Sequence, residues 1–210
     1  MRALIVVDIQ NDFLPGGALA VPGGDEIVPL INGLIRCFPL VVATRDWHPP
    51  DHGSFASNHP GRKVGETILL DGLEQVLWPP HCVQGTRGAA FSPELDTSRF
   101  AAVFKKGVDP RVDSYSAFFD NAHRRSTGLA EYLEERGIRK VAICGLATDY
   151  CVLYSVRDAR RLGLDTWVIR DACRGIDLQP GDSERAFAEM EERGARLVES
   201  SEILGAEAHP

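Results

Sequence analysis

Short apolar runs recur along this chain, separated by stretches with helical spacing, and this alternation limits the possible folds more than any other feature. The runs lie at 3–7, 39–44, 100–104, 140–144 and 165–170, with a last candidate near 195–199. Strands that alternate with helices predict an α/β fold built on a mostly parallel sheet.

Two helices stand out between these strands. One is predicted over about 126–136, where Gly137 follows as a stop signal. The other is predicted over about 148–162 and ends before Gly163, which places Cys151 in its first turn.

The segment 46–99 has weak periodicity, with Pro, Gly, His, Asn and Ser distributed through it. A long irregular connection in a compact fold is usually functional. With 210 residues and no repeat or linker, the chain is expected to form a single domain, 1–210.

Composition narrows the class of partner. The net charge of -7 argues against nucleic acid, because phosphate binding needs clustered Lys and Arg. No apolar run reaches the roughly 20 residues of a membrane span. Five cysteines without a CxxC spacing fit reduced thiols, so we expect a cytoplasmic protein.

Polar residues that follow the apolar runs are candidates for chemistry, because ligands of open parallel sheets bind at the carboxyl ends of the strands. Asp8 follows the first run, where burial would perturb its pKa as a general base requires. The alternative is an Asp that only caps the next turn. Lys106 ends another run and is expected to face the same crevice, with Lys105 on the opposite face.

Cys151 lies where a strand ends and a helix begins, in Gly145-Leu-Ala-Thr-Asp-Tyr-Cys151. A helix N-terminus favours thiolate and lowers the pKa of a thiol. The backbone N–H groups of Ala147 and Cys151 are candidates for an oxyanion hole. The alternative is a small core residue, the role we expect for Cys37, Cys144 and Cys173.

The segment Asp46-Trp-His48-Pro-Pro-Asp-His52 follows a strand and is joined later by Trp78-Pro-Pro-His81-Cys. An Asp and a His two residues apart, with a distant second His, suit a divalent metal such as Zn, Fe or Mn. The alternative is that each loop histidine is an ordinary surface residue.

Five stretches together resemble the nicotinamidase/pyrazinamidase members of the isochorismatase-like cysteine hydrolases, and the likeness covers nearly the whole chain. They are VVDIQNDFLPGGALAVPGG at 6–24, TRDWHPPDHGSFASNHPG at 44–61, WPPHCVQGT at 78–86, VFKKGVDPRVDSYSAFFDN at 103–121 and GLATDYCV at 145–152.

The resemblance implies a three-layer α/β/α fold with a six-stranded parallel sheet. It further implies a set of site residues: the catalytic triad Asp8, Lys106 and Cys151, the metal ligands Asp46, His48 and His81, and the pocket walls Phe13, Trp78 and Tyr115. The peptide bond between Leu146 and Ala147 is expected to be cis, and His52 is left outside the ligand set.

The activity implied is hydrolysis of nicotinamide to nicotinate and ammonia through a cysteine thioester, in NAD salvage, with pyrazinamide as a further substrate. One divalent metal and no organic cofactor are implied, and a homodimer is expected. The alternatives are another amidohydrolase of the same family, or a metal-binding or thiol module without catalysis.

Overall fold

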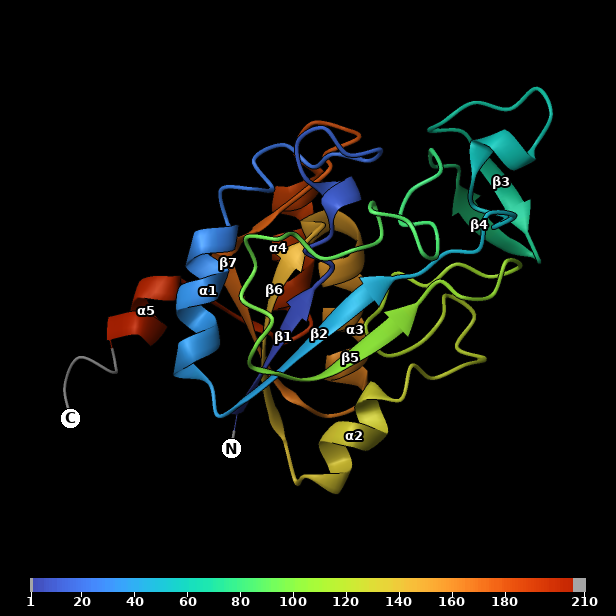
Figure 1. Ribbon diagram of the computed structural model, residues 1–210. Helices are drawn as coiled ribbons and strands as arrows, with labels where there is room; N and C mark the ends of the chain where they lie inside the picture. The colour runs from blue at the N-terminus through green and yellow to red at the C-terminus, as the bar shows by residue number, and fades with distance from the viewer. Residues whose placement is uncertain (1, 206–210) are drawn as a thin grey trace.

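The six predicted strands form one sheet in the order β5-β2-β1-β6-β7-β8 (Figure 1). They are β1 (Arg2–Val7), β2 (Leu40–Asp46), β5 (Phe100–Lys106), β6 (Lys140–Leu146), β7 (Asp165–Arg174) and β8 (Arg196–Val198). The structure is a computed structural model that describes residues 2–205. Every neighbouring pair in this sheet is parallel, so the predicted parallel α/β fold is confirmed.

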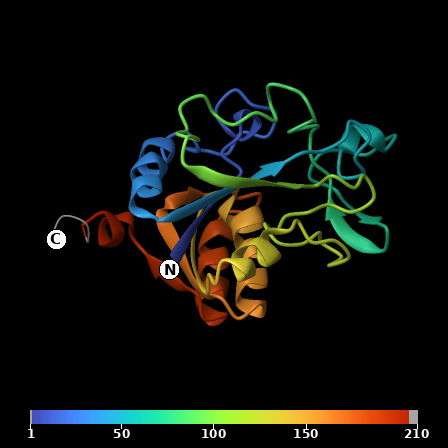
Figure 2. The ribbon, with the colours of Figure 1, turned by 60° about the horizontal axis from the view of Figure 1, so that its bottom comes forward.

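Helices cover both faces of the sheet and complete the three predicted layers. They are α1 (Val28–Cys37), α2 (Leu129–Glu135), α3 (Leu153–Arg161), α4 (Asp182–Glu192) and the short α5 (Ser200–Leu204). Figure 2 shows α1 on one side of the sheet and the yellow to red helices α2, α3 and α4 on the other.

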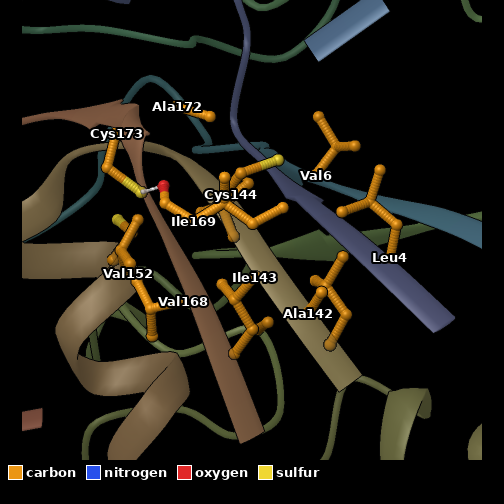
Figure 3. Close-up of a cluster of buried hydrophobic side chains, with 14 of the residues drawn as sticks. Leu4, Val6, Ala142, Ile143, Cys144, Val152, Val168, Ile169, Ala172 and Cys173 are labelled. Carbon is orange, nitrogen blue, oxygen red and sulfur yellow. Dashed lines mark hydrogen bonds between the residues drawn. The ribbon is translucent and has the colours of Figure 1, made fainter. Parts of the chain in front are cut away.

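The two central strands are buried on both faces, as a parallel sheet between helix layers requires. Residues 3–7 of β1 have no exposed surface. Figure 3 shows Leu4 and Val6 of β1 beside the apolar side chains of β6 and β7.

Two of the three cysteines expected in the core lie there. Cys144 and Cys173 are buried, and the Cys173 thiol donates to the Ile169 carbonyl at 3.3 Å (Figure 3). Cys37 is only half-buried, because it ends α1, where its thiol donates to the Gly33 carbonyl at 3.5 Å.

The helix predicted over 148–162 is present, but its first turn is different from the expectation. Thr148–Val152 forms a π-helical turn, and the α-helix α3 begins only at Leu153. π-helical turns are frequent at functional sites. The turn contains Cys151, so the candidate nucleophile lies in a widened backbone segment and not in a regular helix start.

The helix predicted over 126–136 is shorter in the structure, because α2 begins at Leu129. The Thr127 hydroxyl accepts the Leu129 N–H at 3.2 Å and so satisfies a donor at the helix start from outside the helix. Gly137, with φ 64°, follows the C-terminal end as predicted.

The segment 46–99 is mostly irregular, but it contains a hairpin that the sequence analysis did not predict. Strands β3 (Thr67–Leu70) and β4 (Leu73–Val76) pair antiparallel and project from the body of the protein in both ribbon views (Figures 1 and 2). Asp71 and Gly72 join them, both with positive φ. Asp-Gly between two apolar pairs is the sequence signal for such a turn.

Two short 3₁₀ helices, η1 (Asn11–Phe13) and η2 (Ala56–Asn58), complete the described elements. Among residues 2–205, none of the helices combines the length and apolar character needed to cross a membrane.

Candidate active site

Four neighbouring strands of the sheet deliver the candidate catalytic and metal-binding residues to one edge. Asp8 follows β1, Asp46 ends β2, Lys106 ends β5, and Cys151 lies in the turn after β6. Since β5, β2, β1 and β6 are adjacent and parallel, their carboxyl ends meet, which is where open α/β sheets bind ligands.

Lys106 connects these residues. The residue is 1% exposed, and Nζ lies 2.8 Å from Oδ2 of Asp8 and 3.3 Å from Sγ of Cys151. Nζ also pairs with Oδ1 of Asp46 and donates to the Ser114 carbonyl at 3.2 Å. Lys105 is exposed on the other face, as strand alternation predicts.

Asp8 is held by the strand beside it. The Thr44 hydroxyl donates to Oδ1 at 2.7 Å, whereas Oδ2 faces Lys106 and accepts no well-directed hydrogen bond from residues 2–205. Asp8 has φ 51°, a left-handed conformation that Asp tolerates better than most residues. The sharp bend turns the carboxylate into the crevice instead of along the sheet.

Burial and ion pairing set the charge states of Asp8 and Lys106. Burial raises the pKa of Asp8 to about 6, against the lowering effect of the Lys106 ammonium. Burial alone would lower the pKa of Lys106, but the Asp46 and Asp8 carboxylates outweigh it and hold that pKa well above its usual value. Lys106 is therefore a cation at neutral pH and Asp8 is largely ionised.

Cys151 differs from the sequence expectation in its pKa. A thiol at a helix start was expected to have a lowered pKa, but burial raises the pKa of Cys151 well above its usual value. The Lys106 ammonium opposes this rise only in part. The resting thiol is therefore protonated, so it would need a base to act as a nucleophile.

The backbone around Cys151 has the form implied by the resemblance. The Leu146–Ala147 peptide bond is cis. Ala147 lines the same cavity as Cys151 and is followed directly by the π-helical turn. The proposed oxyanion donors, the N–H groups of Ala147 and Cys151, thus lie on one short segment.

Asp46 connects this catalytic cluster to a second one. While Oδ1 pairs with Lys106, Oδ2 lies 3.5 Å from Nε2 of His48 and 3.7 Å from Nε2 of His81. Burial would raise the pKa of Asp46, but Lys106 and His48 hold it well below its usual value. The carboxylate is ionised and offers Oδ2 to the two imidazoles.

Both imidazoles have the arrangement of metal ligands. Nδ1 of His48 lies 2.9 Å from the Gly107 carbonyl, and Nδ1 of His81 lies 2.8 Å from the Pro79 carbonyl. A carbonyl accepts only from N–H, so each Nδ1 carries a hydrogen, and the neutral imidazole in this tautomer presents the lone pair of Nε2 to a metal. Candidate ligand atoms of Asp46, His48 and His81 lie within 4.8 Å of one another. These residues therefore fit a divalent metal ion.

Gly107 makes the His48 position possible. A Cβ at this residue would lie 2.2 Å from Cε1 of His48, and its φ is 65°. Only glycine combines that backbone conformation with so close an approach. The glycine after Lys106 thus helps to position His48, a candidate metal ligand.

His52, left outside the ligand set, lies beside it. Its ring centroid is 4.4 Å from that of His48, and burial lowers its pKa to about 4. Ser54 contacts Nδ1 through its hydroxyl at 2.7 Å, whereas Nε2 has no partner among the residues described. Ligand atoms of His48, His52 and Asp113 form a second group within 4.8 Å.

The predicted pocket walls surround the same cavity. Phe13, Trp78 and Tyr115 line it together with Cys151 and the candidate metal ligands. The Tyr115 hydroxyl accepts the Trp78 indole N–H at 3.1 Å and the Gln75 amide at 2.9 Å. The aromatic walls are therefore fixed by hydrogen bonds as well as by packing.

Sequence reasoning missed four further residues of this cavity: Leu19, Asp113, Tyr150 and Ile176. The first three lie inside the stretches that carry the resemblance, which was a usable signal. Ile176 lies outside all of them, in the connection between β7 and α4. No local pattern in that connection marks it as a pocket residue.

Comparisons with known proteins agree with this geometry. The family model described as the isochorismatase domain matches residues 2–202. Nicotinamidase of Escherichia coli is 52% identical, with 93% of each chain covered. A nicotinamidase/pyrazinamidase structure from Acinetobacter baumanii is 50% identical with a TM-score of 0.93 and covers 96% of this chain and 97% of its own. The Pyrococcus horikoshii pyrazinamidase in complex with zinc is 42% identical with a TM-score of 0.78 and covers 94% and 98%.

Proposed function

The chain belongs to the isochorismatase family, and from this premise we propose that it is a nicotinamidase, which hydrolyses nicotinamide to nicotinate and ammonia. The observation that carries the proposal is that Cys151 lines one cavity with an Asp–His–His set, and that the buried Lys106 and Asp8 lie directly behind it. Two relatives named nicotinamidase are 50% and 52% identical over 96% and 93% of this chain, which supports the choice of substrate.

In the proposed first half-reaction, Asp8 removes the thiol proton of Cys151 while sulfur attacks the carboxamide carbon. The Asp8 carboxylate suits this role, because its pKa of about 6 leaves it largely ionised at neutral pH. Lys106 stabilises the developing thiolate at 3.3 Å. Asp8 then returns the proton to the nitrogen, the C–N bond breaks, and ammonia leaves a thioester on Cys151.

The second half-reaction repeats these roles with water. Asp8 removes a proton from a water molecule, whose oxygen attacks the thioester carbon. The C–S bond breaks, nicotinate forms, and the sulfur of Cys151 recovers the proton. In both halves the N–H groups of Ala147 and Cys151 are the proposed donors to the oxyanion.

Asp46, His48 and His81 are the proposed ligands of a divalent ion, with Zn, Fe or Mn as the candidates. When bound, this ion supplies a Lewis-acidic site for the pyridine nitrogen of the substrate, which orients the ring. Phe13, Trp78 and Tyr115 are proposed to enclose the ring, since aromatic walls suit a flat apolar ligand.

The proposal extends to pyrazinamide, whose ring also has a nitrogen in the position that nicotinamide presents. Nicotinamide is the pyridine amide contained in NAD, so we place the activity in NAD salvage. The cytoplasm is the proposed compartment, because the cysteines among residues 2–205 form no disulfide.

Ammonia release from a panel of amides tests the function. Nicotinamide and pyrazinamide are expected to be hydrolysed, whereas benzamide, which has the same shape without a ring nitrogen, is expected to react poorly. Absence of ammonia from nicotinamide, together with release from a non-aromatic amide, would overturn the proposal in favour of another amidohydrolase of the family.

A further inference from the structure

Asp149 is a buried carboxylate that the proposed chemistry does not use. It lies in the π-helical turn, two residues before Cys151, and is 9% exposed. Its Oδ1 accepts the Ile176 N–H at 2.9 Å and its Oδ2 accepts the Asp177 N–H at 2.7 Å. Both oxygens therefore tie the turn that carries the nucleophile to the connection between β7 and α4.

The same connection is fixed from its other side. The Asp177 carboxylate accepts the backbone N–H and the hydroxyl of Ser183, each at 2.8 Å, in the first turn of α4. A Cβ at Gly175 would lie 1.9 Å from Oγ of Ser183 and 3.1 Å from Oδ1 of Asp149. Only glycine allows the loop 175–177 to pass this close to both anchors.

Ile176 is the residue that this doubly anchored loop places in the active-site cavity. It lines the cavity together with Ala147, Tyr150 and Cys151. Those three residues lie in or next to the π-helical turn that carries Asp149. One carboxylate thus sets the position of an apolar pocket wall relative to the nucleophile.

We infer that Asp149 is a positioning residue and that Ile176, which it holds in place, determines which ring substituents the pocket accepts. The inference rests on the proposed amidase function and adds a specificity determinant to it. A fixed aliphatic wall excludes groups as small as a methyl, since one methylene in a tight apolar pocket changes kcat/KM by about 10-fold to 200-fold. Asp149 acts through Ile176 and does not touch the reacting atoms.

The test compares kcat/KM for nicotinamide with that for its ring-methylated isomers. Ile176→Ala is expected to raise the relative kcat/KM of at least one isomer by about 10-fold. Asp149→Ala is expected to shift the same ratio in the same direction and to raise the KM for nicotinamide. The double variant should add little to the shift, because both changes act on one wall. Asp149→Asn keeps one acceptor oxygen and should give a smaller effect.

A matched control separates this role from general stability. Asp171 also accepts a backbone N–H, that of Ser200 at 2.9 Å, but it lies away from the cavity. Asp171→Asn is expected to lower the melting temperature and leave the substrate ratio unchanged. If Asp149→Ala and Asp149→Asn also lower the melting temperature and leave the substrate ratio unchanged, the inference is wrong. It is also wrong if Ile176→Ala changes the ratio for none of the isomers.

Amide hydrogen exchange gives a readout that needs no activity. In Asp149→Ala the amides of Ile176 and Asp177 are expected to exchange about 10-fold faster or more, because each loses its acceptor. Unchanged exchange would overturn the role of Asp149 even in an active enzyme. A parent chain that releases no ammonia from nicotinamide would overturn the proposed function, and the exchange result would then still decide whether Asp149 holds the loop.

Discussion

The ammonium of Lys106 lies 3.3 Å from the sulfur of Cys151, between the carboxylates of Asp8 and Asp46. One buried cation thus pairs with two buried anions and faces the candidate nucleophile. Removal of the cation would leave two uncompensated negative charges in the interior, which is costly. The candidate catalytic and metal-binding clusters are therefore electrostatically one unit.

Lys106→Gln is expected to lower kcat/KM by about a thousandfold, which is the scale of losing one preorganised charge in an active site. Without the ammonium, the pKa of Asp8 rises further, so the base is protonated at neutral pH. Lys105→Gln is the matched control and should stay within about twofold of the parent, since its side chain is exposed on the other face. Nearly unchanged turnover by folded Lys106→Gln would contradict this role.

His81→Ala is expected to lower the affinity for the divalent metal by more than about 100-fold, because loss of even a supporting residue costs 10-fold to 100-fold. Metal content and affinity are measured by mass spectrometry and competition with a chelator. His123→Ala is the control, because His123 pairs with Asp158 outside the cavity.

Chelation of the parent should abolish ammonia release, with recovery on addition of Zn, Fe or Mn. Full activity after verified metal removal would count against the Asp46, His48 and His81 site.

Tyr115→Phe tests whether the aromatic wall depends on its hydroxyl. The change leaves the Trp78 and Gln75 donors without their shared acceptor, so the free energy of unfolding should fall by about 1 to 3 kcal/mol. The KM for nicotinamide should rise, with a smaller change in kcat. Tyr132→Phe, on α2 away from the cavity, should change the free energy by less than about 0.5 kcal/mol. Equal effects of the two substitutions would show that the hydroxyl has no special role.

Glu189 gives a pH-dependent contribution to stability that is independent of the active site. Hydrogen bonds from Arg157 and Arg193 lower its pKa from 4.5 to about 2. Glu189 then binds a proton more readily in the unfolded chain than in the folded one. These hydrogen bonds therefore stabilise the fold above pH 4.5, and the stabilisation is lost as pH falls toward 2.

The corresponding measurement is chemical unfolding of Glu189→Gln across this pH range. At pH 7 the free energy of unfolding should fall by about 1 kcal/mol, a value discounted because water screens a partly exposed pair. The difference from the parent should shrink between pH 4.5 and about 2. Glu192→Gln, on the same helix and without an ion pair among residues 2–205, serves as control. A difference that grows in acid would contradict the ion-pair account.

Much of the fold could be predicted from the sequence, because buried parallel strands are continuous apolar runs. All six strands of the main sheet, with β1 at its centre, were recognisable in this way. The helices α1 and α4 were not predicted individually, and the hairpin β3–β4 was missed although Asp71-Gly72 signals its turn. Short elements with few apolar residues give weak periodicity, and tertiary contacts decide them.

The candidate site could likewise be predicted only in part from the sequence. Asp8, Lys106 and Asp46 could be selected because each residue follows or ends an apolar run, and strand ends meet in space. The pKa of Cys151 could not be predicted, because it depends on how deeply the turn is buried. Ile176 could not be predicted either, since its place in the cavity depends on two hydrogen bonds to Asp149, which is distant in sequence.

The most direct test is the rate of ammonia release from nicotinamide by Cys151→Ala, measured beside Cys173→Ala at matched protein and metal content. If Cys151 is the nucleophile, Cys151→Ala should release no ammonia above the uncatalysed background. Its melting temperature should stay close to that of the parent. Cys173→Ala, which changes a core thiol, should keep turnover within about tenfold of the parent. Ammonia release by folded Cys151→Ala at a rate comparable to the parent would contradict the account.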